Sequence, residues 1–318
     1  PACSTERSSL RCFPQPELEA LSKYGPKVMV RSVKHINKDE EITVAYIDLL
    51  MPKELRQEEL QSKYCFRCEC LRCSASPPRR IDLMLEKGSS QSLLGSVQEE
   101  DIRREMSDEV SEGITQFLCY ENPQGCCEIL ETLLIDGVER DSNAYMLNPG
   151  SHLALRSYTA MSSAYRARAL TCQGPLAQRF SKLSASYSLL LSIASYNLYI
   201  HEPSVVGSVA TFWANAADSL ISLTGGAPGG SYSCSRCELN GAVRGISVPG
   251  ELLSCIGRLL KEGWWWLENR ATVDSINLDE MWPSGEPETR SDGGGKIFEL
   301  GMHCLSLGKM LSYTCYGA

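Results

Sequence analysis

Four cysteines crowd into a nine-residue stretch, at Cys65, Cys68, Cys70 and Cys73. Zn²⁺ prefers four thiolate or imidazole ligands in a tetrahedron, with each sulfur about 2.3 Å from the ion. A C-x-C-x-x-C run can fold around one ion and provide three of these ligands. The alternative, a group of buried free thiols, is disfavoured because four cysteines this close together beside Pro-rich chain cannot all lie in a core. The sequence therefore predicts a metal site whose fourth ligand comes from elsewhere.

Two predicted elements lead into the cysteines. Glu41–Ile47 has apolar side chains at alternate positions, the two-residue period of a strand. Together with Lys27–Val33, it is expected to form a hairpin-like unit that is too small to hold a core alone. Met51-Pro52 then opens a polar helix that runs to about Lys63, because Pro fits the first turn of a helix. Ser74–Arg80, rich in Ser and Pro, is expected to be a linker.

These segments also resemble a known family. Glu-Glu-Ile-Thr-Val-Ala-Tyr-Ile-Asp at 40–48, Leu-Leu-Met-Pro at 49–52, an Arg/Glu-rich helix and Tyr-Cys-Phe-x-Cys-x-Cys-x-x-Cys at 64–73 follow one another. The order closely resembles the end of the SET domain and the post-SET zinc loop of the SET- and MYND-containing (SMYD) lysine methyltransferases. The close match covers about Lys27–Cys73, and the rest resembles that family's helical C-terminal domain in length and character only.

The resemblance implies a fold class, an activity and two cofactors. The expected fold is α+β: a partial SET β-fold with a post-SET zinc loop, followed by a larger all-α domain. The implied domains are residues 1–63, the end of the SET domain; 64–80, the zinc segment and linker; and 81–318, the helical domain. The implied activity is S-adenosyl-L-methionine-dependent methylation of a lysine-containing protein, a histone tail or another protein, with Zn²⁺ as a structural ion.

The resemblance also assigns site residues. Tyr46 falls on the active-site tyrosine beside the transferred methyl, Tyr64 on the aromatic that lines the lysine channel, and Phe66 on the ring that stacks against the cofactor's adenine. The three zinc ligands that it assigns are Cys68, Cys70 and Cys73.

Methyl transfer explains why aromatic residues are suited to this site. Displacement at a sulfonium methyl needs the neutral lysine nitrogen aligned with the S–CH₃ bond, and positioning supplies much of the barrier reduction. An aromatic channel holds the lysine stem, excludes water and favours loss of the ammonium proton, since burial lowers a lysine pKa. A tyrosine hydroxyl adds a fixed dipole where charge moves. Without the surrounding motif, Tyr46 would be an ordinary strand tyrosine with a satisfied hydroxyl.

The family's fourth zinc cysteine lies in an Asn-His-Ser-Cys segment that also holds the cofactor. Pro1-Ala2-Cys3 resembles the chain just after that segment, and the Gly-rich cofactor loop and the MYND finger are missing. We therefore expect an incomplete chain that is inactive by itself. Cys3 is close enough in sequence to substitute as the fourth ligand, although the resemblance places it at a non-ligand position, so that ligand stays open.

Charge divides the chain into two parts. Residues 1–80 hold 14 Lys+Arg against 11 Asp+Glu, a net of +3, and the remainder holds 17 against 28, a net of −11. The acidic part is expected to attract a Lys-rich partner, the alternative being a solvated acidic surface.

The acidic part also has helical periodicity, with a spacing loosely like tetratricopeptide arrays but without their consensus. The expected helices are 102–117, 126–135, 152–172, 176–200, 204–223, 251–269 and 296–312.

Weaker features favour structural roles. Cys234, Cys237 and Cys255 lack a well-spaced fourth ligand, so a loop or core is expected there rather than a second zinc site. Trp264–Trp266 points indoles around most of a helix, which favours burial over a partner-binding groove. The expected partners do not include nucleic acid or a membrane, because basic-aromatic stripes and apolar runs of about 20 residues are absent.

The 15 cysteines, an odd number without a secretory leader, indicate a reducing compartment, so the expected location is the nucleus, the cytoplasm or both. Two other functions compete with the enzyme. One is a non-catalytic zinc-containing helical module that recognises a peptide. The other is a metal-buffering or redox protein.

Overall fold

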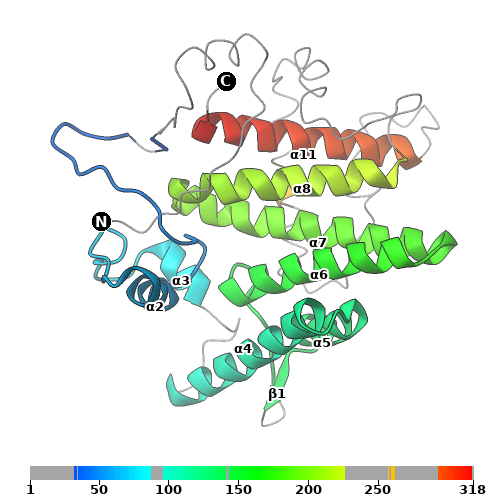
Figure 1. Ribbon diagram of the computed structural model, residues 1–318, viewed down its shortest axis with the longest axis horizontal. Coiled ribbons are helices and arrows are strands. Elements are labelled where there is room, and N and C mark those ends of the chain that lie inside the picture. Colours follow the sequence, from blue (N-terminus) through cyan, green and yellow to red (C-terminus); the bar gives the residue numbers. More distant parts are fainter. Residues whose placement is uncertain are drawn as a thin grey trace.

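The computed structural model describes residues 32–33, 35–86, 96–140, 143–225, 257, 259–261 and 293–316 (Figure 1). The described part is mostly helical and contains one two-stranded sheet, in agreement with the expected α+β class. Three predictions fall outside the described residues. They concern the strand residues Lys27–Arg31, the three cysteines weighed as a second zinc site (Cys234, Cys237 and Cys255) and the tryptophans Trp264–Trp266.

A stack of helices makes up most of the part of the chain that the structure describes. Neighbouring helices in this stack pack side by side, and α11 packs against α8. Figure 1 shows the order from α11 at the top, through α8, α7 and α6, to α5 and α4 at the bottom. The bounds are α4 Ser96–Leu118, α5 Pro123–Ile135, α6 His152–Thr171, α7 Gly174–His201, the 3₁₀ helix η1 Pro203–Val205, α8 Val206–Leu223 and α11 Gly293–Tyr316.

The helix ends follow from local residues. The Asn122 side chain accepts a hydrogen bond from the Gly125 N–H, and Ser151 accepts one from the Ala154 N–H, so both cap a first turn. Pro occupies the first turn of α5 and of α7, where its missing N–H costs nothing. The predicted helices over 102–223 and 296–312 are therefore confirmed, with ends shifted by a few residues. Within the predicted helix 251–269, the described residues 257 and 259–261 are helical.

Helices α8 and α11 approach closely at two glycines. A Cβ placed on Gly308 would lie 3.1 Å from the Ala210 carbonyl oxygen, and one on Gly301 would lie 2.8 Å from a side-chain carbon of Ile221. Leu300, Cys304, Leu307 and Leu311, spaced three or four residues apart, form the buried face of α11. No helix in the described part of the chain combines the length and apolarity needed to cross a membrane.

Two shorter helices, α2 Lys53–Tyr64 and α3 Arg80–Glu86, lie at one end of the stack (Figure 1). α2 confirms the predicted polar helix, with Pro52 as its N-cap residue. α3 was not predicted; it contacts α6 and α7, and Ile81 and Leu85 are buried in the main core. A second, smaller core contains Ile47, Leu60, Cys68 and Cys73. The cysteine segment therefore packs between α2 and the chain that precedes it.

The predicted strand Glu41–Ile47 is wrong. The segment is irregular, and no strand is found among the described residues before α4. A strand needs a hydrogen-bonded neighbour, and only Ser32 and Val33 of the predicted partner are described. The side chains of the predicted inward face are instead exposed, with Ile42 at 72%. The partial SET β-fold is thus not seen in the described residues.

The sheet that does form was missed. β1 Val138–Arg140 pairs with β2 Asn143–Tyr145 in antiparallel register, with Val138 opposite Tyr145. Gly137 precedes it with a positive φ of 72°, and a Cβ there would lie 2.3 Å from the Tyr145 carbonyl oxygen. Three residues per strand are too few for a periodic signal, although Asp136-Gly137 and Asp141-Ser142 are turn-favouring pairs.

Candidate metal centre and aromatic cluster

The sulfurs of Cys68, Cys70 and Cys73 converge. All three lie within 4.8 Å of one another, Cys68 and Cys73 are buried, and Cys70 is partly buried. Sulfurs around one tetrahedral Zn²⁺ are about 3.8 Å apart, given a metal–sulfur distance of about 2.3 Å. The three thiols therefore fit a shared zinc ion with small movements, and three soft sulfur donors are a set that Zn²⁺ favours.

The thiols interact closely even without an ion. A hydrogen bond with Cys73 and burial together raise the pKa of Cys70 to about 12. Without a cation, Cys70 is accordingly protonated at neutral pH. A metal ion that binds here must displace protons, so its affinity would rise with pH.

α2 holds the cysteine segment through a side-chain amide. Gln57 donates from Nε2 to the Cys68 carbonyl oxygen at 2.8 Å, and its Oε1 accepts from the Cys68 N–H at 2.9 Å. The helix ends at Tyr64, and Cys65 takes a left-handed conformation with φ 58°. This reversal turns the chain back along α2 and brings Cys68 opposite Gln57.

The three aromatic residues that the resemblance assigned to the active site also meet. The rings of Tyr46 and Tyr64 are 5.1 Å apart between centroids, and those of Tyr46 and Phe66 are 5.8 Å apart; both pairs are edge-to-face. The Tyr64 hydroxyl donates to the Tyr46 carbonyl oxygen at 3.3 Å. Tyr46 is 40% exposed and Tyr64 45% exposed, so the cluster is open to solvent.

The aromatic and cysteine clusters are contiguous. Phe66 packs against the small core that contains Cys68 and Cys73. Tyr46 precedes Ile47, which is buried in the same core. The structure thus brings all six sequence-assigned residues into one region, joining the segment around Tyr46 to the end of α2.

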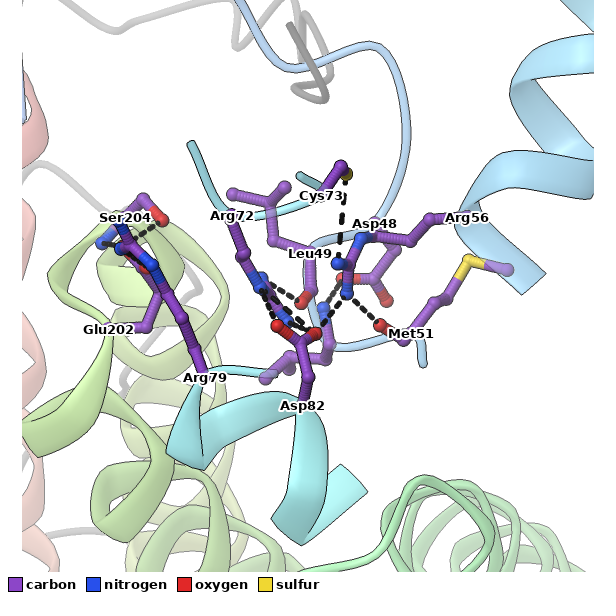
Figure 2. Close-up of polar contacts among 11 residues, drawn as sticks. Asp48, Leu49, Met51, Arg56, Arg72, Cys73, Arg79, Asp82, Glu202 and Ser204 are labelled. Atoms are coloured by element: carbon purple, nitrogen blue, oxygen red, sulfur yellow. Dashed lines mark hydrogen bonds and ion pairs between the residues drawn. The ribbon is translucent and has the colours of Figure 1, made fainter. Parts of the chain in front are cut away.

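A buried charge cluster lies next to Cys73 (Figure 2). Asp82 of α3 forms ion pairs with Arg56 Nη1 at 2.7 Å and with Arg72 Nη2 at 2.8 Å. All three side chains are buried: Asp82 is 1% exposed, Arg56 0% and Arg72 7%. Burial acts to lower the pKa of Arg56, but the charges and hydrogen bonds of Asp82 and Cys73 together outweigh burial, so that the pKa is raised. The Arg56 guanidinium therefore stays charged in the interior.

The sequence reading missed these polar residues. Arg56 and Gln57 belong to a helix in which most residues are charged or polar, and nothing in its pattern separates a buried arginine from a solvated one. The one available signal was the position of Arg72 inside the cysteine run.

Cys3 lies outside the described residues, and Cys65 is exposed, so the described residues contain three candidate ligands in one group.

Known proteins show what this chain resembles. No family model matches it. Protein SET DOMAIN GROUP 41 of Arabidopsis thaliana is 34% identical over 327 residues, which cover 92% of this chain and 58% of that protein. N-lysine methyltransferase SMYD2 of Mus musculus is 33% identical over 126 residues, 39% of this chain and 28% of that protein. Histone-lysine N-methyltransferase SMYD3 of Mus musculus is 45% identical over 49 residues, 15% of this chain and 11% of that protein.

The chain is therefore a relative of SET-domain proteins. Within that class its relatives include SMYD-type proteins, as the resemblance over about Lys27–Cys73 had indicated. The chain spans 58% of the length of Protein SET DOMAIN GROUP 41, and less of the two SMYD proteins.

Proposed function

We propose that the chain is the C-terminal portion of an S-adenosyl-L-methionine-dependent protein-lysine methyltransferase. The observation that carries this proposal is the meeting of Tyr46, Tyr64 and Phe66 beside the thiol group. In this proposal residues 1–63 complete a SET domain, 64–80 form the post-SET zinc segment, and 81–318 form the helical wall of the substrate channel.

The two tyrosines are suited to different tasks. The hydroxyl of Tyr64 is engaged by the Tyr46 carbonyl oxygen, which fixes the Tyr64 ring as a wall for an apolar lysine stem. The Tyr46 hydroxyl has no hydrogen bond to other described residues, so it can orient a reacting nitrogen or methyl group. The edge-to-face pair of rings would exclude water from one side of the lysine, which favours the neutral, nucleophilic form of its amine.

The two cofactors would have separate places. S-adenosyl-L-methionine supplies the methyl group as a sulfonium when it is bound, and Phe66 offers the ring face against which its adenine would stack. Cys68, Cys70 and Cys73 would hold Zn²⁺, which is a structural ion here and fixes the segment that carries Phe66.

The substrate would be a lysine-containing protein, a histone tail or another basic segment, in the nucleus or the cytoplasm. The net charge of −11 beyond residue 80 supports this choice, because an acidic surface raises the local concentration of a basic peptide.

The test is methyl transfer by the full-length protein that contains this chain, measured by mass spectrometry on Lys-containing proteins. We expect Tyr46→Phe to lower kcat by about 10²-fold, the scale of losing one fixed dipole at the reacting atoms. Tyr120→Phe, at an exposed tyrosine between α4 and α5, is the matched control and should have no effect. The 318-residue chain alone should show no turnover. Full activity in Tyr46→Phe, or turnover by the chain alone, would contradict the proposal.

A second candidate is a zinc-containing, non-catalytic module that recognises a peptide. The continuous helical core from α4 to α11 favours it, because such stacks present extended binding surfaces. The upstream coding sequence separates the two candidates. An Asn-His-Ser-Cys segment and a Gly-rich loop immediately before Pro1 support the enzyme, whereas a start codon close to Pro1 supports the module.

A further inference from the structure

Arg56 contacts the thiol group and the helical stack at once. Its Nη2 lies 3.9 Å from the Cys73 sulfur, and its Nη1 donates to Asp82 and to the Met51 carbonyl oxygen, at 2.7 and 2.6 Å. Figure 2 shows the guanidinium between these three groups. One planar fork thus joins a candidate zinc ligand, the start of α2 and α3.

The charge of this region suits a metal–thiolate group. Arg56, Arg72 and Asp82 together leave one excess positive charge in the interior. Three thiolates around one Zn²⁺ leave one excess negative charge. Opposite charges in a low-dielectric interior attract strongly, and each would be costly without the other.

A purely structural role explains this arrangement poorly. The Nε of Arg56 is buried and has no hydrogen-bond partner among the described residues. Asp82 already has Arg72, which contacts both of its carboxylate oxygens and also donates to the Leu49 carbonyl oxygen. A second buried arginine therefore adds an uncompensated charge. Besides Asp82, it reaches the neutral Met51 carbonyl oxygen and the Cys73 sulfur, and of these two groups the sulfur is the one that becomes anionic in a metal–thiolate site.

We propose that Arg56 is a positioning residue for the metal site: it orients the Cys73 sulfur and balances the charge of the metal–thiolate group, while Asp82 fixes its guanidinium. This inference rests on the zinc site of the proposed function. Hydrogen bonds from groups around metal ligands commonly change metal affinity 10- to 100-fold. A lysine in this place would keep the charge but could not bridge three partners.

The structure provides a matched pair of variants. Arg56→Lys and Arg72→Lys make the same change in two arginines that share Asp82. Of these two arginines, only Arg56 contacts a cysteine sulfur among the described residues. Zinc affinity of the 318-residue chain is measured by competition with a chromophoric chelator. Far-UV circular dichroism and urea unfolding show whether each variant is folded and how stable it is.

We expect Arg56→Lys to lower zinc affinity about 10-fold and Arg72→Lys to lower it less than 3-fold. With Co²⁺ in place of zinc, the sulfur-to-cobalt absorption bands should shift in Arg56→Lys and stay unchanged in Arg72→Lys. If Arg56→Lys does not fold, Arg56→Gln, which keeps a planar donor, takes its place with the same expectation.

Equal zinc affinities in the two lysine variants, with tight binding by the unsubstituted chain, would overturn the role of Arg56 and leave the zinc site intact. No zinc binding by the unsubstituted chain would overturn the zinc site and this inference together. A failure of methyl transfer in the full-length protein changes neither reading, because zinc binding is measured independently.

Discussion

Gln57 shows how a single side chain positions a candidate ligand without touching its sulfur. The planar amide makes two hydrogen bonds to one residue, with the Cys68 N–H and the Cys68 carbonyl oxygen. Both backbone groups are partly buried, so leaving them unpaired would cost about 1–3 kcal/mol each before water compensates. α2 therefore fixes the first cysteine of the metal segment in a defined direction.

Gln57→Glu keeps the shape of the side chain but replaces the donor with a carboxylate that faces a carbonyl oxygen. We expect the free energy of unfolding to fall by about 1–2 kcal/mol, as measured by urea denaturation at pH 7. Gln61→Glu, one turn further along α2 at an exposed position, is the matched control and should change it by less than about 0.5 kcal/mol. Equal stabilities of the two variants would show that the two hydrogen bonds between the Gln57 side chain and the Cys68 backbone do not stabilise the fold.

The sequence could predict the cysteines and aromatics of this region because their types are rare and closely spaced. Cys68 and Cys73 are only five positions apart, with Cys70 between them, so local chain geometry alone brings the three cysteines together. Arg56 and Asp82 are 26 residues apart, and their pairing depends on the docking of α3, which no local pattern records.

At the scale of one element, α6 carries a histidine whose pKa is set by burial and by an arginine one turn along the helix. His152 is the first residue of α6, after the N-cap Ser151, and it is partly buried. Burial, and then the charge of Arg156 one turn along, lower the pKa of His152 to about 4. The ring is therefore neutral in the folded protein at pH values where it would be charged in the unfolded chain.

A lowered histidine pKa means that the unfolded state binds more protons below about pH 6.5, so stability falls as pH decreases toward 4. We expect His152 to contribute a loss of about 2 kcal/mol between pH 7 and pH 5. The measurement is urea unfolding of the unsubstituted chain and of His152→Gln at both pH values. The variant should lose about 2 kcal/mol less than the unsubstituted chain, and an identical loss in both would refute the role of His152.

Helices were predictable here and strands were not, for a physical reason. A helix such as α7 satisfies its backbone within the segment and repeats its apolar face every three or four residues. Glu41–Ile47 had the period of a strand, but pairing depends on a distant neighbour that the segment itself does not supply. β1 and β2 pair across a turn yet are too short for their periodicity to be recognised.

At the scale of the whole molecule, two ionic links join the cysteine segment to the helical stack. Asp82 of α3 holds Arg72 from within the cysteine run, and Arg79 contacts the buried Glu202, after α7, at 3.3 Å. Ser204 also donates to Glu202 at 2.7 Å. The candidate site is therefore anchored to the stack beside α6 and α7 (Figures 1 and 2). In the proposed enzyme, this anchoring sets where the helical wall stands relative to the aromatic cluster.

The account depends on one metal ion held by three thiolates beside that cluster, and native mass spectrometry tests it directly. The unsubstituted chain and Cys65→Ser should carry the same number of zinc ions, because Cys65 is exposed and outside the converging group. Cys73→Ser should carry one ion fewer, since two remaining thiolates hold zinc poorly. An unchanged zinc count in Cys73→Ser would contradict the account.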